Sequence, residues 1–382
     1  MSNGLEMRRI RWGMIGGGPG AFIGSVHRAA ARLCNSYALV GGVFSSDYER
    51  GLAFARGEAI GLDRVYRNVE EMVEKESARP EGDRIEAVTI VTPNCLHYRE
   101  AKVLIRAGLN VICEKPVTVT LDEALELERL VEENGTAFCV AYAYTGYPMV
   151  RQMRSLVSEG AIGELQRVDS QYYQGWINPC IHDRENRERV WRLRPDAAGK
   201  SCCIGDIGVH SFNLIEYVTG RRVTGVLARL NCMCEEVPLD VDGDVLLEME
   251  GGGRGIIRAS QVATGEENNL MLQLYGSKGG MKWSQEDPNR LHLLPEGAPA
   301  QVYKTANPYN AVPALNSSTL PPGHPEGFFE AFANLYRAFA EDLLREERTD
   351  EDYPVMAEGV RGMMFIEASV ESSSAGNRWV SL

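Results

Sequence analysis

The chain has 382 residues, enough for two domains of ordinary size that each bury a substantial core. Its formal net charge of -13 argues against a nucleic acid or an anionic membrane surface as partner, because either would repel it. The nine cysteines include no CxxC pair, no apolar run approaches the ~20 residues of a membrane span, and residues 1–9 lack the apolar core of a signal peptide, so we expect reduced thiols and a cytoplasmic protein.

The first predicted element is an apolar strand over residues 10–15, which runs into a glycine-rich turn and then a helix over residues 25–33. This arrangement lets backbone amides bind a pyrophosphate at the positive end of a helix. Two glycines of the turn fit the start of a dinucleotide fingerprint, and the third position is filled either by Ala21 or, after an insertion of three residues, by Gly24. The candidate cofactor contacts in this turn are Gly16, Gly18, Phe22 and Ile23.

The second predicted strand, residues 38–44, ends where such folds normally face the adenosine ribose. An acid there binds the 2'-hydroxyl of NAD, whereas a small hydroxyl residue with a nearby arginine can accept the 2'-phosphate of NADP. Here Ser45 and Ser46 follow the strand and Arg50 lies one helical turn further on, which favours NADP over NAD. Two alternatives stay open: Asp47 could take the acidic role, and Arg50 could be an ordinary solvated helix residue.

Three further strands, residues 87–91, 109–113 and 137–141, alternate with helices over 98–107 and 121–133. Strands that alternate with helices predict an α/β fold with a doubly wound parallel sheet of the Rossmann type. Polar residues directly follow the strand that ends at residue 91, so we expect them at the ligand-binding edge of the sheet. They are Thr92, Pro93, Asn94 and His97.

The next strand delivers Glu114, Lys115 and Pro116 to the same edge. The proline fixes its own φ and biases Lys115 toward extended geometry, so the turn that carries the amine is stiff. A lysine there would point into the crevice where open parallel sheets bind their ligands. The alternative is that Glu114 and Lys115 are an ordinary solvated pair.

After residue 148 the pattern changes to a helix over residues 149–159 and then to longer alternating strands, which predict a second, α+β domain with a large, open and mostly antiparallel sheet. We expect a dinucleotide-binding domain at residues 1–146 and a substrate-binding and oligomerisation domain at 147–382, whose closing helix packs back on the first domain. The strands are expected at residues 165–174, 223–232, 244–249 and 255–262, an irregular loop at 285–319, and helices at 326–345 and 355–373. An open sheet must cover one face, so a homodimer or homotetramer through this sheet is expected.

Asp206 and His210 stand four residues apart where a helix over residues 208–219 is predicted to begin. Residues at that spacing share one helix face. A histidine oriented by a carboxylate is an effective general base near neutral pH. The alternative is a helix cap at Asp206 followed by a hydrogen-bonded structural histidine.

The Glu-Lys-Pro motif at residues 114–116 and the Gly-Asp-x-Gly-x-His motif at residues 205–210 together resemble those of the Gfo/Idh/MocA oxidoreductases, and the resemblance covers nearly the whole chain. It implies that NAD(P) binds with contacts from Glu114 and Lys115 as well, and that residues 92–94 and His97 edge the nicotinamide pocket. The catalytic residues that it implies are Lys115, Asp206 and His210. The residues that it places at a sugar or cyclitol substrate are Lys115, Tyr144, Trp176, Arg192, Asp206 and His210.

The implied reaction is hydride transfer between the nicotinamide and a secondary alcohol or ketone of the substrate. His210 would accept the hydroxyl proton, Asp206 would orient the imidazole, and Lys115 would donate to the developing alkoxide. Two alternatives are a non-catalytic dinucleotide-binding sensor, which would not need both a lysine and a histidine, and a zinc-dependent polyol dehydrogenase, for which no standard ligand spacing exists. The zinc alternative would draw on Cys180, His182, Cys202, Cys203 and His210.

Overall fold

The computed structural model describes residues 8–232, 237–345 and 352–382, which form two compact units. The first unit contains the described residues within 1–118, 122–141 and 332–359, and the second contains those within 119–121, 142–331 and 360–382. Each unit carries one sheet and its own core, so each is described by itself.

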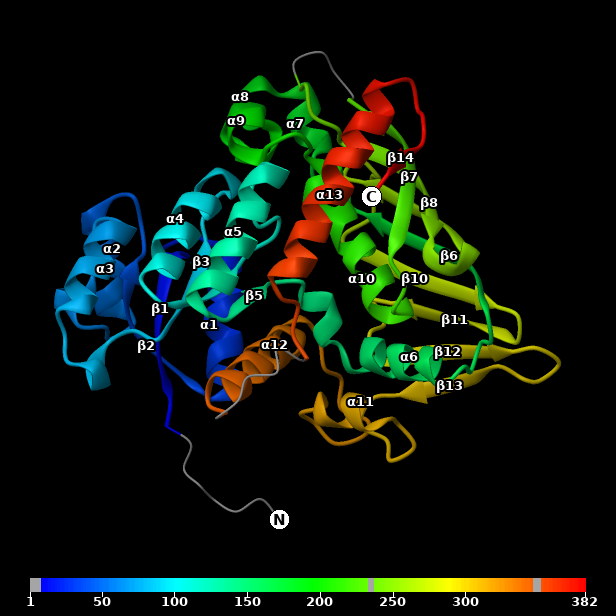
Figure 1. Cartoon of the computed structure of the whole chain (residues 1–382), viewed down its shortest axis with the longest axis horizontal. Helices are drawn as coiled ribbons and strands as arrows, with labels where there is room; N and C mark the ends of the chain where they lie inside the picture. Colours follow the sequence, from blue (N-terminus) through cyan, green and yellow to red (C-terminus); the bar gives the residue numbers. More distant parts are fainter. Residues whose placement is uncertain (1–7, 233–236, 346–351) are drawn as a thin grey trace. The chain divides into compact units, whose positions relative to one another are not determined.

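The first unit is built on a five-stranded parallel sheet with the order β2-β1-β3-β4-β5. Every residue of the central strand β3 is buried, as expected for a strand covered by helices on both faces. The doubly wound α/β fold predicted for this half is therefore confirmed (Figure 1). Its strands are β1 (Ile10–Gly16), β2 (Tyr37–Val43), β3 (Ala87–Val91), β4 (Asn110–Cys113) and β5 (Phe138–Val140). Its helices are α1 (Phe22–Cys34), α2 (Tyr48–Gly57), α3 (Val69–Ser77), α4 (Asn94–Arg106) and α5 (Leu121–Asn134), with 3-10 turns at Leu62–Arg64 and Glu81–Asp83.

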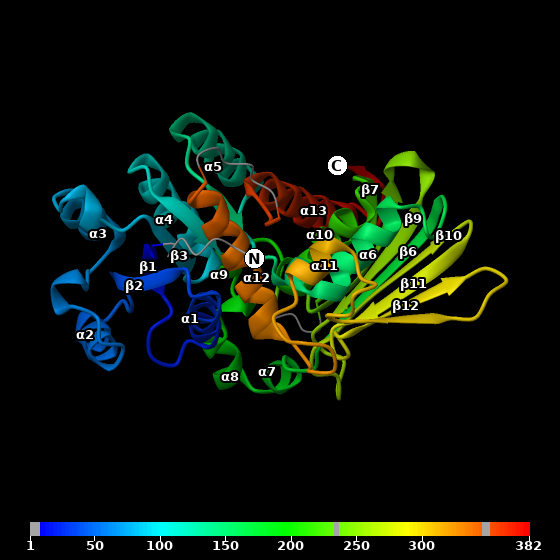
Figure 2. The same cartoon turned by 90° about the horizontal axis from the view of Figure 1, so that it is seen from below.

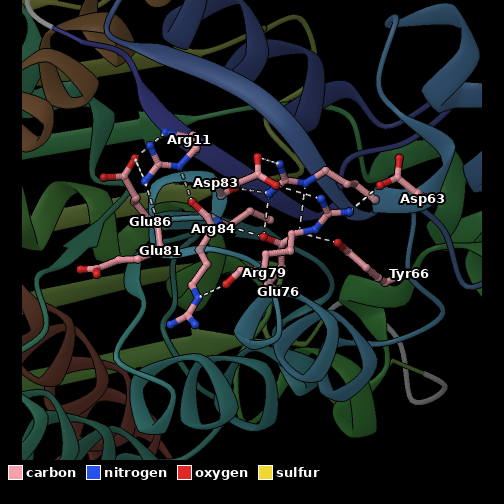
Figure 3. Close-up of polar contacts among 11 residues, drawn as sticks. Arg11, Asp63, Tyr66, Glu76, Arg79, Glu81, Asp83, Arg84 and Glu86 are labelled. Carbon is pink, nitrogen blue, oxygen red and sulfur yellow. Dashed lines mark hydrogen bonds and ion pairs between the residues drawn. The ribbon is translucent and has the colours of Figure 1, made fainter.

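A buried ionic cluster ties helix α3 to the segments that flank it (Figure 3). Arg64 donates through Nε and Nη2 to the two carboxylate oxygens of Glu76, at 3.0 and 2.6 Å, and both residues are buried. Glu76 also accepts from the Tyr66 hydroxyl and from the backbone N–H of Ile85. Because the Glu76 carboxylate has several donors, its charge is compensated inside the core.

The second unit carries a nine-stranded sheet in the order β13-β12-β11-β10-β6-β9-β8-β7-β14. All neighbouring strands run antiparallel except β6 and β9, so the prediction of a mostly antiparallel sheet is confirmed. The strands are β6 (Leu165–Tyr173), β7 (Val223–Asn231), β8 (Asp242–Met249), β9 (Arg254–Ser260), β10 (Asn269–Gly276), β11 (Gly279–Ser284), β12 (Arg290–Pro295), β13 (Gln301–Lys304) and β14 (Val380–Ser381).

Helices of the second unit cover one face of this sheet, with α6 (Pro148–Ser158) and α10 (Val209–Thr219) lying directly on it (Figure 2). Burial alternates along β8, where Val245, Leu247 and Met249 are buried while Asp244, Leu246 and Glu248 are exposed. The opposite face is therefore open among the described residues. The other helices are α7 (Asn178–His182), α8 (Arg184–Arg189), α9 (Pro195–Ala198), α11 (Val312–Asn316), and α12 (Phe328–Leu343) and α13 (Met356–Ser374), which both contribute to the two units. Short 3-10 turns lie at Ala143–Gly146, Trp191–Leu193 and Glu250–Gly252.

One prediction about local structure is wrong, and a second, the helix over residues 208–219, is confirmed as α10 but is incomplete at its start. The segment 285–319 is no irregular loop, since it contains β12, β13 and α11. The helix expected from residue 208 starts earlier, because a π-helical turn, Ile204–Gly208, runs directly into α10. Asp206 therefore lies inside the helical segment and does not precede it.

None of the helices in the described part of the chain combines the length and the apolar character needed to cross a membrane.

Candidate active site

The glycine turn after β1 is shaped for close backbone approach. Gly16 and Gly17 adopt φ values of 80° and 71°, which favour glycine. A Cβ on Gly24 would lie 2.3 Å from the Cα of Gly17, so only glycine lets helix α1 pack this closely on the turn. A Cβ on Gly18 would likewise lie 2.2 Å from the carbonyl oxygen of Phe44. Gly24, and not Ala21, thus fills the third position of the fingerprint, and the turn fits a pyrophosphate at the amino end of α1.

The two remaining candidates of this turn lie in the first turn of α1. Phe22 is its first residue and is 73% exposed, and Ile23 follows it. The helix begins three residues earlier than predicted, with Ala21 at the N-cap. Arg28, in the second turn of the helix, donates to the carbonyl oxygen of Gly17 at 2.5 Å and so stabilises the glycine turn.

Asp47 caps helix α2 at the end of the second strand. Its Oδ1 accepts from the backbone N–H groups of Glu49 and Arg50, at 3.0 and 3.3 Å, and its own N–H donates to the Ser45 hydroxyl at 3.1 Å. Ser46 and Arg50 are exposed. The Asp47 carboxylate is therefore held beside the position expected for the adenosine ribose.

His97 is fully buried in the first unit and joins two segments at the sheet edge. Its Nε2 lies 2.8 Å from the carbonyl oxygen of Thr92, and its Nδ1 lies 2.9 Å from that of Pro116. Burial lowers the pKa of His97, although both carbonyls oppose that effect. Both ring nitrogens thus lie against backbone carbonyls, so His97 packs between the segment of Thr92, Pro93 and Asn94 and the Glu-Lys-Pro turn.

Glu114 is a buried carboxylate at the end of β4. Its Oε1 lies 2.9 Å from Nε2 of His27 on helix α1, and its Oε2 accepts from the backbone N–H of Lys115 at 3.2 Å. Lys115 is half-buried, and the peptide bond between it and Pro116 is cis. The pair is consequently not an ordinary solvated one, because Glu114 belongs to the core.

In the second unit, the carboxylate of Asp206 is held by two side chains. Gln261 donates through Nε2 to its Oδ2 at 2.9 Å, and Nε of Arg192 lies 3.2 Å from its Oδ1. Gln261 is fully buried, and its amide oxygen accepts from the thiol of Cys202 at 3.3 Å. The structure thus brings together Asp206 and Arg192, two of the residues singled out from sequence.

Asp240 anchors the start of the helical segment that carries Asp206 and His210. Its buried carboxylate accepts from the backbone N–H groups of Cys202 and Ile204, at 3.1 and 2.8 Å. Burial raises the pKa of Asp240, while these N–H groups and the Ser201 hydroxyl oppose the rise. A residue distant in sequence, and not Asp206, therefore does the capping.

His210 is buried on α10 and borders three tyrosine rings. The ring centroids of Tyr142, Tyr144 and Tyr172 lie 5.8, 4.9 and 6.2 Å from that of His210. The Tyr144 and Tyr172 hydroxyls are hydrogen-bonded to each other. One wall beside the imidazole is thus aromatic with polar tips.

A chain of hydrogen bonds continues from these tyrosines to Trp176. The Tyr172 hydroxyl donates to Oδ1 of Asn268 at 2.7 Å, Gln174 donates to the same oxygen at 2.8 Å, and the Trp176 indole donates to Oε1 of Gln174 at 3.0 Å. Trp176 is 38% exposed, so the chain runs from the buried tyrosines beside His210 toward the surface. Tyr144 and Trp176, both expected at the substrate, therefore belong to one network.

Sequence reasoning missed five residues of these networks: His27, Gln174, Asp240, Gln261 and Asn268. Gln174 and Gln261 are polar residues directly after the strands β6 and β9, a signal that could have identified them. Asp240 and His27 act on partners far away in the sequence, so no local pattern marks them.

The cysteines of the zinc alternative lie in apolar surroundings. Cys180 and Cys202 pack in one hydrophobic cluster with Leu193 and Val241, and both are free thiols. Among the described residues there is no group of three or more His, Cys, Asp or Glu side chains that could hold a metal ion.

The fold and these residues define an oxidoreductase with an NAD-binding Rossmann domain and a separate substrate-type domain. Residues 10–142 match the family model described as "Oxidoreductase family, NAD-binding Rossmann fold", and residues 150–282 match the GFO/IDH/MocA C-terminal domain. The chain belongs to the GFO/IDH/MocA family of oxidoreductases, as its two motifs predicted.

Similar proteins span the full length of the chain. The oxidoreductase YfiI of Bacillus subtilis is 32% identical over 391 residues, which cover 100% of this chain and 99% of YfiI. The structure of an inositol dehydrogenase homolog from Azotobacter vinelandii complexed with NAD+ has a TM-score of 0.91 and 33% identity, with 98% of each chain covered. The complex of such a homolog with NADH and myo-inositol has a TM-score of 0.90 and 32% identity, with the same coverage. Levoglucosan dehydrogenase of Pseudarthrobacter phenanthrenivorans is 27% identical over 331 residues, 78% of this chain and 80% of the relative.

Proposed function

We propose that this oxidoreductase transfers a hydride between NAD(P) and a secondary alcohol or ketone of a neutral sugar or cyclitol. The observation that carries the proposal lies in the second unit, where tyrosine rings border a histidine and their hydroxyls join a chain of asparagine, glutamine and tryptophan side chains. Aromatic faces and amides bind hydroxyl groups and the apolar faces of sugar rings without requiring charge. The similarity to an inositol dehydrogenase homolog that binds myo-inositol points to the same substrate class.

In the oxidation direction, His210 accepts the proton of the substrate hydroxyl at a ring nitrogen. Asp206, whose carboxylate is fixed by Gln261 and Arg192, favours the charged form of the imidazole. Lys115 donates a hydrogen bond to the alkoxide oxygen as it develops, a role in which one positioned donor is worth roughly 3 kcal/mol. The bound nicotinamide supplies hydride acceptance at C4.

The cofactor is held at its pyrophosphate by the turn of Gly16 and Gly18 and at its adenosine end near Ser45 and Ser46. The remaining contacts in this proposal come from Phe22, Ile23, Arg50, Thr92, Pro93, Asn94, Glu114 and Lys115. His97, which is fully buried, supports these contacts without touching the cofactor. Arg50 supports the use of NADP, whereas the capped carboxylate of Asp47 beside Ser45 opposes a 2'-phosphate. The preference for NADP stays a prediction that cofactor titration decides.

The substrate contacts in this proposal are Tyr144, Trp176 and Arg192, together with Lys115, Asp206 and His210. The domains are proposed to divide near residue 146. The protein is proposed to act in the cytoplasm as a homodimer or homotetramer.

The test is a titration with NAD and NADP followed by a screen of hexoses, sugar phosphates and inositols, read as the absorbance of the reduced nicotinamide. We expect turnover with at least one neutral polyol, and its loss in Lys115→Ala and in His210→Ala, with cofactor affinity largely kept in both. Comparable turnover in either variant would remove the role given to that residue. Binding of cofactor without turnover of any substrate would instead favour a dinucleotide-binding sensor.

A further inference from the structure

A buried chain of hydrogen bonds runs behind Lys115 through the core of the first unit. His27 on α1 lies at its centre, 2.9 Å from Glu114 through Nε2 and 2.8 Å from the Tyr336 hydroxyl through Nδ1. The same hydroxyl lies 2.8 Å from Oγ1 of Thr89, which accepts from the Trp12 indole at 2.8 Å. All five residues are buried.

The chemistry of the end groups fixes the direction of the hydrogen bonds at the two ends of this chain. Burial alone raises the pKa of the Glu114 carboxyl, but the hydrogen bond and the charge of His27, together with the charge of Lys115, outweigh it and hold the pKa below its usual range. A carboxylate can only accept, so Nε2 of His27 carries the proton that points at Glu114. At the other end the Trp12 indole donates to Thr89, and between them the Tyr336 hydroxyl pairs with both Thr89 and Nδ1 of His27.

The chain cannot carry protons away from the lysine. Its far end is the indole of Trp12, which only donates and is 2% exposed, so a proton entering at Glu114 has no exit. A closed network of this kind fixes geometry. His27 is also held sideways, because the rings of Phe332 and Tyr336 lie edge-on to it with centroids 5.0 and 5.7 Å away.

We propose that His27 is a positioning residue for Lys115: it holds Glu114 as an ordered carboxylate beside the lysine and links that turn to the cofactor-binding helix α1. The inference rests on the proposed function, because it assigns His27 to the same reaction. His27 touches neither substrate nor cofactor in this role. It acts through Glu114, whose Oε2 accepts a hydrogen bond from the backbone N–H of Lys115.

The test compares His27→Gln with His27→Asn, two neutral amides that differ by one methylene. The amide of glutamine reaches the place of Nε2 and can still donate to Glu114, whereas that of asparagine reaches only the place of Nδ1, near Tyr336. We expect kcat of His27→Asn to fall about tenfold or more below that of His27→Gln, with the Kd for NADH within about twofold in both. In a Glu114→Gln background, the kcat values of the same two substitutions should differ little, because the carboxylate that accepts from residue 27 is already replaced.

Equal kcat for the two amide variants would overturn the proposal, as would an undiminished difference in the Glu114→Gln background. If His27→Asn does not fold, Tyr336→Phe replaces it. This variant removes the hydroxyl that pairs with Nδ1 and should lower kcat severalfold, and wild-type kcat would overturn the proposal.

A second readout does not need turnover, so it separates this inference from the proposed function. Limited acetylation by acetic anhydride, followed by mass spectrometry, measures the labelling rate of Lys115. Without a donor from residue 27 the buried Glu114 tends to take up a proton, and its negative charge then no longer attracts the nearby ammonium of Lys115. Lys115 should therefore label faster in His27→Asn than in His27→Gln and wild type. If the wild-type protein turns over no polyol, the proposed function fails, but the labelling comparison still tests the role of His27. Equal labelling rates of Lys115 in all three proteins would refute that role.

Discussion

Gln261 shows how one buried amide can govern a carboxylate that is assigned to catalysis. Its Nε2 donates to Asp206 and its Oε1 accepts from the Cys202 thiol. Gln261→Leu removes the donor and leaves Asp206 with fewer partners, so we expect kcat/KM to fall roughly 10- to 100-fold, as for the loss of a hydrogen bond to a charged group. Steady-state kinetics with the best polyol of the screen would measure this. Cys202→Ala is the matched control, since it removes only the weak thiol contact on the other side, and an equal loss there would contradict the explanation.

Glu100 gives a pH dependence of stability whose sign can be worked out. It accepts a hydrogen bond from Thr92 at 2.6 Å, and burial raises the pKa of its carboxyl from an ordinary value of 4.5 to about 7. The folded state therefore binds more protons than the unfolded state between these two pH values, and the free energy of unfolding falls as pH rises through that window.

Glu100→Gln keeps an acceptor for Thr92 but cannot ionise. We expect this variant to be more stable than wild type at pH 8 by roughly 1–3 kcal/mol, and to match wild type near pH 4. Urea unfolding at the two pH values measures both differences. A constant difference across pH would show that the ionisation of Glu100 is not its cause.

Substitutions that remove only the charge of Asp47 or of Arg50 can test the preference between NADP and NAD. Asparagine caps a helix as well as aspartate does, so Asp47→Asn should keep helix α2 while removing a negative charge near the adenosine ribose. We expect the ratio of the Kd for NADP to the Kd for NAD to fall by about tenfold, and to rise in Arg50→Gln. Fluorescence titration with the two reduced cofactors measures the ratios. Unchanged ratios in both variants would place the 2'-position of the ribose elsewhere.

At the scale of the elements, the buried pair of Arg64 and Glu76 ties α3 to the 3-10 turn before it and to the backbone that enters β3 (Figure 3). Glu76→Leu leaves a buried guanidinium with fewer partners, so we expect a loss of about 3–5 kcal/mol in the free energy of unfolding. Chemical denaturation measures it. Asp63→Asn weakens an exposed pair with Arg79 in the same network and should cost at most about 1 kcal/mol. Similar losses in the two variants would show that burial does not govern the cluster.

The elements also show which parts of the site a sequence can reveal. Strands and turns carry local signals, so the glycine turn and the Glu-Lys-Pro turn were predicted at the strand ends where they lie. The start of the helix that carries Asp206 and His210 was missed, because the cap that fixes it is Asp240, more than thirty residues further along the chain. The strands β12 and β13 were missed for a different reason. They are short and lie among prolines and asparagines, which dominate the local pattern.

For the whole molecule, the fold class could be predicted because the strands of the first half are continuously apolar whereas those of the second half alternate. The family could be predicted from the motifs at residues 114–116 and 205–210. The residues that support the site from behind could not be predicted. His27, Gln261 and Asn268 bind partners that lie 55 or more residues away in the sequence. Pairwise contacts at such separations are a product of the tertiary fold and leave no periodic trace.

The open face of the nine-stranded sheet carries the proposal of an oligomer. On this face Leu246 of β8 is 42% exposed and stands beside Ile256 of β9, so an apolar stretch lies uncovered within the second unit. A charge placed there would be buried without a partner in a face-to-face assembly, so we expect Leu246→Glu to dissociate the oligomer. Light scattering coupled to size-exclusion chromatography measures the mass. Leu125→Glu is the control, because Leu125 is similarly exposed, at 44%, on helix α5 of the other unit. A monomeric wild-type protein would contradict the proposed oligomer. An oligomer that persists in Leu246→Glu would show that the interface lies elsewhere.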